Sequence, residues 1–295
     1  MAQERYDALV GLDVVKQQVV AEATVLLDPS RLDKWGKKHH GTDLRVVDEV
    51  KQRTPLLVFA GDVGTGKTEL AETFGASVSR SMSVGVSLFS LSLAARGSGA
   101  VGEMTTLLTR AFEEVASVAS KALDDKRRIR HGVILLVDEA DALAQSRELV
   151  HMHHEDRAGV NALVRGVDNL RRDLRPVLTV LCTNRVEALD PAVLRRAAGV
   201  HVFNRPNDVQ RRKLLANLLE GINPSEKELD SLVTLAGATS DRSYGCTYSD
   251  IRQRLVPQAV LDAVSRDVPL TGTLVIQHAE KLIPTRPFGM NNDGG

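Results

Sequence analysis

AGDVGTGKTEL, residues 60–70, is the stretch that decides how this chain of 295 residues folds. An apolar run from Leu56 to Ala60 leads into it and predicts a buried strand. Gly61 to Thr68 then fits the pattern G-x-x-x-x-G-K-[ST], whose glycines let backbone N–H groups converge on a phosphate. A helix predicted from Thr68 onward would offer its positive end to the same phosphate. We therefore expect a strand, a phosphate-binding loop and a helix in succession.

The end of the loop carries side chains with defined chemistry. Lys67 should reach the β- and γ-phosphates of a nucleoside triphosphate, and the Thr68 hydroxyl should bind Mg²⁺. The pattern therefore predicts ATP and Mg²⁺ as cofactors. The residues predicted to contact the nucleotide here are Asp62, Val63, Gly64, Thr65, Gly66, Lys67, Thr68 and Glu69.

A pair of acids, Asp138 and Glu139, follows a run of apolar residues that predicts a second buried strand. Such a pair alone is usually a surface feature at a strand end. With a phosphate loop upstream, we predict that Asp138 and Thr68 hold Mg²⁺ and that Glu139 polarises the attacking water. Asn184 ends another buried strand, and its amide can help to place that water. The sequence thus predicts an ATPase that forms ADP and phosphate.

Apolar strands alternate with amphipathic helices through the first two thirds of the chain, which predicts an α/β fold: a parallel sheet between helices, in three αβα layers. Strands are expected at 56–60, 84–91, 133–137, 178–182 and 200–203. Helical patterns dominate after residue 207, and Pro257 should kink or restart the helix that contains it. The predicted domains are 1–206, a nucleotide domain; 207–285, a small helical lid; and 286–295, a flexible tail.

Composition argues against several functional classes. Lys plus Arg and Asp plus Glu are both 38, so the chain lacks the basic excess of a nucleic-acid binder. Aromatic residues make up 3%, too few for base-stacking platforms. No run of apolar residues is long enough to span a membrane, and two cysteines give no disulfide framework. We expect a cytoplasmic protein that contacts neither membrane nor nucleic acid.

Several stretches together resemble the AAA+ ATPases. These are the phosphate loop, VILLVDEAD (133–141), VLCTN (180–184) and DPAVLRRA (190–197). The resemblance covers about residues 5–285 and implies an αβα nucleotide domain, a helical lid and a homo-oligomer, usually a hexameric ring with ATP between subunits. It also implies that Val10 and Gly11 touch adenine through the backbone, and that Asn184 is the polar residue called sensor 1.

Arg195 and Arg196 match the arginine fingers of that family, which reach the γ-phosphate held by a neighbouring subunit. A guanidinium added there stabilises the charge that spreads over the γ-phosphoryl oxygens in the transition state. The alternative is a solvated arginine pair at a helix end. The sequence does not separate the roles of the two residues.

Asp62 departs from the family, whose members commonly carry Pro-Pro where this chain has Asp62 and Val63. Because such a loop holds phosphate through backbone N–H groups, the side chain of Asp62 can point away from the ligand. We expect it to face outward, toward a neighbouring subunit or a basic side chain. Asp62→Pro should then leave ATP binding largely intact.

The stretch Gly245 to Ile251 resembles the lid motif G-x-S-G-A-D-[IL]. Some relatives carry a sensor-2 arginine at the position of Ser249, where this chain has none, and Arg252 and Arg254 are nearby candidates for that role. A solvated helix face is the alternative for both arginines, and Ser249 or Asp250 could simply cap the helix.

The stretch 92–104 is where the family places a central-pore loop that grips a polypeptide. The predicted substrate contacts are Gly99, Ala100, Val101 and Gly102, and a plain surface loop is the alternative. Ala100 replaces the family's aromatic residue, so grip by ring intercalation is lost. His151, His153 and His154 fall in a second such loop, and without cysteines or ligand spacing they do not predict a metal site.

The helix region 154–184 and LRRAAG (194–199) most resemble the pachytene-checkpoint-type AAA+ ATPases. Those proteins remodel HORMA-domain proteins by pulling on a mobile terminus, and bacterial members accompany the CBASS antiphage systems. The resemblance implies a hexameric motor acting on a HORMA-domain protein. Since 60 residues precede Gly61 and the fold uses most of them, we expect no separate adaptor-binding domain.

Two other functions remain open from the sequence. One is a nucleotide-gated scaffold or DNA-associated loader without threading, which Ala100 favours and the neutral charge opposes. The other is a degenerate ATPase that binds nucleotide only, which the complete set of catalytic residues disfavours.

Overall fold

The computed structural model describes residues 2–93, 102–125, 128–143 and 153–288, with the backbone alone at 153–157. The chain forms two compact units. The first comprises residues 2–6, 14–60 and 68–202, and the second comprises 7–13, 61–67 and 203 onward. The predicted domain boundaries, 1–206, 207–285 and 286–295, stay a prediction.

A sheet of five strands, in the order β2-β3-β4-β1-β5, forms the centre of the first unit. The strands are β1 (Leu56–Gly61), β2 (Gly85–Ser92), β3 (His131–Asp138), β4 (Val177–Thr183) and β5 (Gly199–Phe203). The pairs β2/β3, β3/β4 and β1/β4 are parallel, with Ser92 opposite Asp138 and Ala60 opposite Thr183. The carboxyl ends of these strands therefore meet at one edge, where Glu139 follows β3 and Asn184 follows β4.

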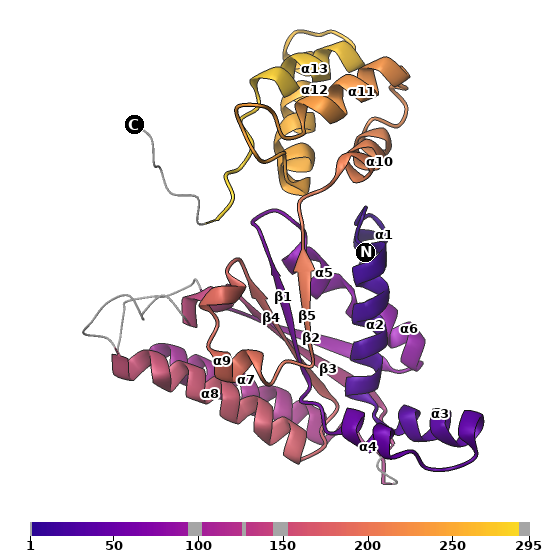
Figure 1. Ribbon diagram of the computed structural model, residues 1–295, viewed down its shortest axis with the longest axis vertical. Coiled ribbons are helices and arrows are strands. Elements are labelled where there is room, and N and C mark those ends of the chain that lie inside the picture. Colours follow the sequence, from indigo (N-terminus) through magenta and orange to yellow (C-terminus); the bar gives the residue numbers. More distant parts are fainter. Residues whose placement is uncertain (1, 94–101, 126–127, 144–152, 289–295) are drawn as a thin grey trace. The chain divides into compact units, whose positions relative to one another are not determined.

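Helices cover both faces of this sheet, which confirms the predicted αβα architecture (Figure 1). On one face α7 (Glu103–Ser120) and α8 (His153–Arg172) pack against each other and against alternate strand residues such as Val58, Leu135 and Val137. On the other face, Phe59 of β1 meets Phe74 edge-on, with ring centroids 6.1 Å apart. Other helices of this unit are α1 (Ala2–Asp7), α2 (Asp13–Leu27), α3 (Ser30–His40), α4 (Arg45–Lys51), α5 (Lys67–Thr73), α6 (Gly75–Met82) and α9 (Pro191–Leu194).

The second unit is helical. Its helices are α10 (Asp208–Leu218), α11 (Glu226–Leu235), α12 (Val256–Ser265) and α13 (Gly272–Lys281). Asn207 and Ser225 begin α10 and α11 with capping boxes, which satisfy N–H groups that a helix start leaves free. A π-helical turn, Asp250–Leu255, precedes α12, so the predicted restart of the helix at Pro257 is confirmed. Leu214, Leu232 and Val275 form the core of this unit.

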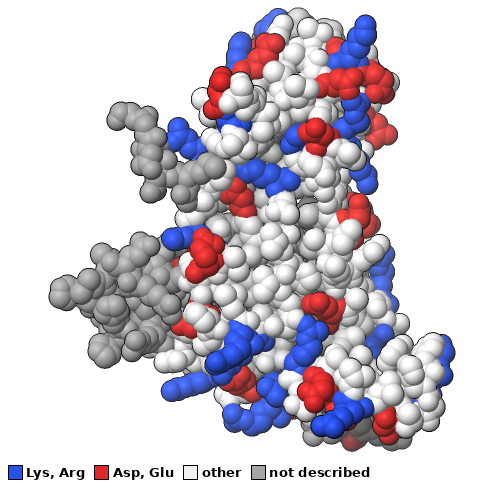
Figure 2. All heavy atoms as spheres, viewed as in Figure 1, with Lys and Arg blue, Asp and Glu red and all other residues white. Residues whose placement is uncertain are grey.

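Surface charge is mixed in sign. On the face drawn in Figure 2, basic and acidic side chains are interspersed among uncharged residues. This agrees with a net charge of zero and differs from the single basic stripe of a nucleic-acid-binding face. Within the described part of the chain, no helix combines the length and apolarity needed to cross a membrane.

Candidate nucleotide site

The glycines of the phosphate loop are required by its close packing within the second unit. Gly61 has φ 154°, and a Cβ on it would lie 2.2 Å from the carbonyl oxygen of Phe203. Gly64 has φ 74°, and a Cβ there would lie 2.7 Å from the Thr247 hydroxyl oxygen. Any side chain at either position would force the backbone to move. The loop therefore keeps its path, and the direction of its N–H groups, because these residues are glycine.

Two buried side chains brace the same loop from inside. The Lys67 ammonium donates to the backbone oxygen of Asp62 at 2.8 Å, and the Thr65 hydroxyl donates to that oxygen at 2.7 Å. Both side chains are almost fully buried. Lys67 is thus placed at the loop itself, as the sequence predicts, with its charge next to the turn that should receive phosphate.

The Asp62 carboxylate pairs with Arg205. Its Oδ2 atom accepts a hydrogen bond from Arg205 Nε at 2.8 Å and a second from the Nη2 atom of the same guanidinium. Its Oδ1 atom accepts from the backbone N–H of Val63, 2.9 Å, and of Phe288, 3.1 Å. The expectation that Asp62 meets a basic side chain is confirmed. Sequence analysis did not identify Arg205 as that side chain.

In the first unit, Thr68 and Asp138 come together as predicted. The Thr68 hydroxyl donates to Asp138 Oδ2 at 3.0 Å, and the backbone N–H of Glu139 donates to Asp138 Oδ1 at 2.9 Å. A hydroxyl and a carboxylate are hard oxygen donors that suit Mg²⁺. No group of three or more His, Cys, Asp or Glu side chains is placed to hold a metal among the described residues. Two protein oxygens fit a Mg²⁺ that takes its other ligands from phosphate and water.

Glu139 lies in a strained backbone position just after β3. Its φ of 57° is in the left-handed region, which few residues other than glycine adopt. Its carboxylate accepts a hydrogen bond of 2.7 Å from the Ser92 hydroxyl at the end of β2. Ser92 was missed by sequence reasoning, and its place at the end of a predicted strand was the one available signal.

Asn184 follows β4, and its backbone N–H donates to the buried carboxylate of Asp141 at 3.3 Å. The Thr183 hydroxyl reaches the same Oδ1 atom at 3.4 Å. Asp141 therefore fixes the turn that presents Asn184. It was also missed, although it is the third acid of the stretch Asp138 to Asp141.

The structure separates the two adjacent arginines. Arg196 is clamped by Asp168 of α8, with Nε and Nη2 each 3.0 Å from a carboxylate oxygen, and its Nη1 donates to Ala192. The hydrogen bond to Asp168 raises the pKa of Arg196 further above its ordinary value. Arg195 is exposed, and its side chain has no hydrogen bond or ion pair with any described residue. Asp168 was not predicted, since it lies on another helix.

An open pocket of about 820 Å³ surrounds Arg195 in the first unit. Its charged lining residues are Lys51, Arg53, Asp168, Arg171, Arg172, Arg195 and Arg196. Lys51 pairs with Asp33, and Arg196 pairs with Asp168. Within the described residues, the other four arginines have no acidic partner. The pocket therefore presents a net positive charge that the described residues do not compensate.

The segment predicted to touch adenine lies in the second unit. Val10 is buried in the helical core, and the Gly11 carbonyl accepts a hydrogen bond of 2.7 Å from Gln210. A Cβ on Gly11, which has φ 77°, would lie 2.6 Å from the Tyr248 hydroxyl oxygen. Burial raises the pKa of Tyr248 to about 12, so its hydroxyl stays neutral.

The candidate sensor-2 residues contact the loop and this segment. The backbone N–H of Ser249 donates to the Gly64 carbonyl at 3.1 Å, and Arg252 donates to the Ala8 carbonyl at 3.1 Å. Asp250 is buried, and its carboxylate accepts a hydrogen bond from the backbone N–H of Thr247. The Thr247 hydroxyl oxygen in turn accepts a hydrogen bond from the backbone N–H of Asp250. Thr247 therefore caps this helix start, and the Asp250 side chain completes the capping box.

Among the other predicted site residues, some have side chains engaged elsewhere and some fall outside the residues that the structure describes. The Glu69 carboxylate pairs with Arg5 at 2.8 and 2.9 Å, so its side chain is engaged away from the loop backbone. Gly99, Ala100, Val101 and His151 fall outside the described residues, and of His153 and His154 the backbone alone is described, in α8. Gly102 has φ 81° and begins α7.

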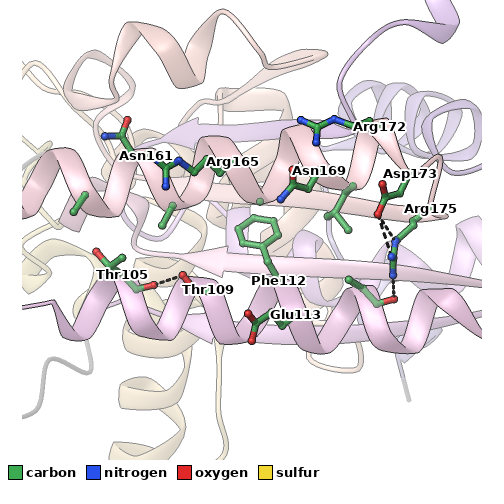
Figure 3. Close-up of a pocket in the computed structure, with 15 residues that line it drawn as sticks. Thr105, Thr109, Phe112, Glu113, Asn161, Arg165, Asn169, Arg172, Asp173 and Arg175 are labelled. Atoms are coloured by element: carbon green, nitrogen blue, oxygen red, sulfur yellow. Dashed lines mark hydrogen bonds and ion pairs between the residues drawn. The ribbon is translucent and has the colours of Figure 1, made fainter.

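A second pocket, about 720 Å³ in volume, lies along α7 and α8 (Figure 3). Phe112 packs beside Gly166, where an added Cβ would lie 2.3 Å from the ring, so glycine permits the two helices to approach. Asn161, Arg165 and Asn169 extend from α8 at successive points along this pocket (Figure 3). The lining contains none of the predicted site residues.

Comparison with known proteins gives a consistent result. Residues 57–206 match the AAA family, described as the ATPase family associated with various cellular activities. The chain is 46% identical over 286 residues to CD-NTase-associated protein 6 of Escherichia coli (strain MS 115-1), which covers 97% of this chain and 92% of that protein.

Two solved structures are similar over nearly their whole length. One is a chain in the structure of the E. coli MS115-1 HORMA:CdnC:Trip13 complex, with a TM-score of 0.88, 45% identity and coverage of 98% of this chain and 94% of that chain. The other is the structure of Rhizobiales Trip13, with a TM-score of 0.74, 41% identity and coverage of 97% and 95%.

Proposed function

Since this chain belongs to the AAA family of ATPases, which hydrolyse ATP, we propose that it is a motor that remodels complexes of a HORMA-domain protein in CBASS antiphage signalling. The observation that carries the proposal is similarity over almost the full chain to a protein solved in a HORMA:CdnC:Trip13 complex. Such coverage includes the second unit as well as the AAA match.

ATP binding is assigned to the phosphate loop. Backbone N–H groups from Asp62 to Thr68 would hold the phosphates, and Lys67 would add a charge beside them. Glu69 would contribute its N–H at the helix start, because its carboxylate is committed to Arg5. Val10 and Gly11 would touch the base. We assign residues 1–206 to the nucleotide domain, 207–285 to the lid and 286–295 to the tail.

Hydrolysis is assigned to the edge of the sheet where β2, β3 and β4 end. Thr68 and Asp138 would hold Mg²⁺, which neutralises charge on the phosphates when bound. Glu139 would accept a proton from the attacking water, with Asn184 helping to orient that water. Ser92 hydrogen-bonds one oxygen of the Glu139 carboxylate, Oε2, and so competes with water for that oxygen.

Completion of the site would come from a second copy of the chain. Arg195 is exposed and unpaired among the described residues, so it is free to reach a neighbour's γ-phosphate. A contact in which one surface meets a different surface of the next copy generates a ring when its rotation closes. We propose a hexamer, with Gly99 to Gly102 facing the polypeptide substrate and with Ser249 and Arg252 at the lid side of the nucleotide.

We also propose that the protein acts in the cytoplasm. Cys182 and Cys246 are both buried and are not joined in a disulfide, which suits a reducing compartment. Burial also raises the pKa of Cys246 to about 11, which keeps its thiol protonated and unreactive.

A trap variant tests the function. Glu139→Gln should bind ATP but lose hydrolysis by at least about 100-fold, since the group that takes up the proton is removed. In the presence of Mg²⁺ and ATP it should retain a HORMA-domain protein in a pull-down. Glu220→Gln, a change at an exposed acid of the second unit, is the matched control and should hydrolyse and release normally.

Retention of duplex DNA in place of a HORMA-domain protein, with a strong dependence on salt, would instead support the loader function. Normal hydrolysis by Glu139→Gln would refute the assigned mechanism.

A further inference from the structure

Arg205 joins three segments of the second unit that are far apart in sequence. Its Nε and Nη2 atoms bond to the Asp62 carboxylate, and its Nη1 atom donates to the Gly245 carbonyl at 2.6 Å. Its guanidinium also lies over the Tyr244 ring, 5.1 Å from the centroid. A planar guanidinium is suited to this combination of a forked ion pair and a stacked ring. Arg205 thus links the start of the phosphate loop to residues 244 and 245.

The ion pair is largely removed from water. The Asp62 side chain is 16% exposed and the Arg205 side chain is 14% exposed. The other carboxylate oxygen of Asp62 is satisfied by two backbone N–H groups, from Val63 and Phe288. A carboxylate at this depth depends on its cation, because without one it would remain as an uncompensated charge. That charge would stand at the first turn of a loop that receives phosphate.

A second set of bonds runs parallel to the first. The Gly64 carbonyl accepts the N–H of Ser249, so the loop is tied to residues 244–250 at two points. Asp250 accepts hydrogen bonds from the N–H and the hydroxyl of Thr285, at 3.0 and 2.6 Å. Phe288, three residues later, returns to Asp62. The loop, the stretch 244–250 and the stretch 285–288 therefore form a closed circuit of hydrogen bonds.

We infer that Arg205 is a positioning residue for phosphate binding: it neutralises Asp62 and holds the phosphate loop against residues 244–250. This inference rests on the proposed assignment of Gly61 to Thr68 to the phosphates of ATP. Arg205 acts on the ligand through the loop, since each of its three guanidinium nitrogens already donates a hydrogen bond to Asp62 or Gly245. Backbone donors bind an anion best when they are already aligned, because alignment then costs nothing on binding.

The inference distinguishes Arg205 from a direct phosphate ligand. If Arg205 neutralises Asp62, its removal harms ATP binding mainly by exposing the phosphates to that carboxylate. Removing the Asp62 charge as well should then restore most of the affinity. If Arg205 touched phosphate itself, its loss would cost the same with or without the acid.

A double-mutant cycle measures this coupling. The affinity for ATP with Mg²⁺ is determined by calorimetry for the full-length protein, Arg205→Met, Asp62→Asn and the double variant. Arg205→Met should weaken ATP binding by about 30-fold, as expected when a buried carboxylate loses its partner. Asp62→Asn alone should change it by less than about 3-fold, and the double variant should return to within about 5-fold of the parent. Arg212→Met, at an exposed arginine paired with Glu226 in the same unit, is the matched control.

Steady-state kinetics adds a measurement that would not change if Arg205 had a purely structural role. Arg205→Met should raise KM for ATP by a factor similar to the loss of affinity and leave kcat within about 2-fold, because Arg205 does not touch the reacting atoms. Arg205→Lys keeps the charge without the fork, so it should fall between the parent and Arg205→Met. This variant also serves if Arg205→Met fails to fold.

An equal loss on removing Arg205 in the parent and in the Asp62→Asn background would overturn the inference in favour of direct phosphate contact. A lowered Tm with unchanged ATP affinity would also overturn it. Lys67→Ala separates these results from a failure of the proposed function. ATP binding that survives Lys67→Ala would remove the nucleotide assignment of the loop itself.

Discussion

Acids at the carboxyl ends of the strands in the first unit and arginines before their amino ends differ in how their charge is satisfied. At the carboxyl end, Asp138, Glu139 and Asp141 each accept a hydrogen bond from the chain's own hydroxyl or N–H groups. Before the amino ends of β1, β4 and β5, four arginines line one pocket without an acidic partner among the described residues: Arg53, Arg171, Arg172 and Arg195.

This difference shows which part of the proposed site is complete within one copy. The acids are held in defined positions and need only the nucleotide, the metal and water. The arginines have no acidic partner in the described part of the chain, so they can receive an anion. Opposite charge on two surfaces of one molecule favours contact between unlike faces of neighbouring copies, which is the contact that a ring requires.

The largest expected effect comes from removing the exposed arginine. Arg195→Ala should lower kcat by at least about 100-fold, because a guanidinium finger stabilises charge in the phosphoryl-transfer transition state. ATP affinity should change little, and Arg128→Ala, at an exposed arginine paired locally with Asp124, should be neutral. Stimulated ATPase activity measures both variants.

Mixing two inactive variants tests whether Arg195 acts on a neighbouring copy. Arg195→Ala and Lys67→Ala should each be inactive alone, since one lacks the finger and the other lacks the phosphate loop. Mixed copies should regain activity, because some interfaces then join an intact loop to an intact Arg195. If activity does not return when the two variants are assembled together, Arg195 acts within its own chain.

The sequence predicted the sheet well because its strands are buried on both faces and therefore read as continuous apolar runs. It also predicted the residues that follow those strands, Asp138, Glu139 and Asn184, since the position of a residue at a strand end is a local property. The placement of Thr68 beside Asp138 follows from the same topology.

Ion pairs between residues far apart in the chain could not be predicted from the sequence. Arg205 lies 143 residues from Asp62, and Asp168 lies 28 residues from Arg196. A charged residue on a helix can be solvated or paired, and neither periodicity nor propensity distinguishes these cases. For the same reason the sequence could not separate Arg195 from Arg196, which differ only in what the rest of the fold offers them.

An intermediate effect is expected from the clamp on Arg196. Asp168→Asn should lower stimulated kcat by about 5-fold, because Arg196 loses its charged partner and the short helix before Arg195 is held less firmly. Asp173→Asn, at an exposed acid beside the end of the same helix, is the control. If Asp168→Asn instead restores activity to Arg195→Ala, the freed Arg196 is the residue that reaches the neighbour's phosphate, and the two roles are reversed.

The smallest effect should come from the hydroxyl that holds the catalytic acid. Ser92→Ala removes the 2.7 Å hydrogen bond to Glu139 and leaves the strained backbone of that residue in place. Without the Ser92 donor, the carboxylate is available to water more often, so basal ATPase activity without a protein substrate should rise by about 2- to 3-fold. Ser90→Ala, an exposed change two residues earlier on the same strand, should leave the basal rate unaltered. A fall in the basal rate with Ser92→Ala would mean that Ser92 positions Glu139 for reaction, so that the acids at this end of the sheet are held in their working arrangement before any partner arrives.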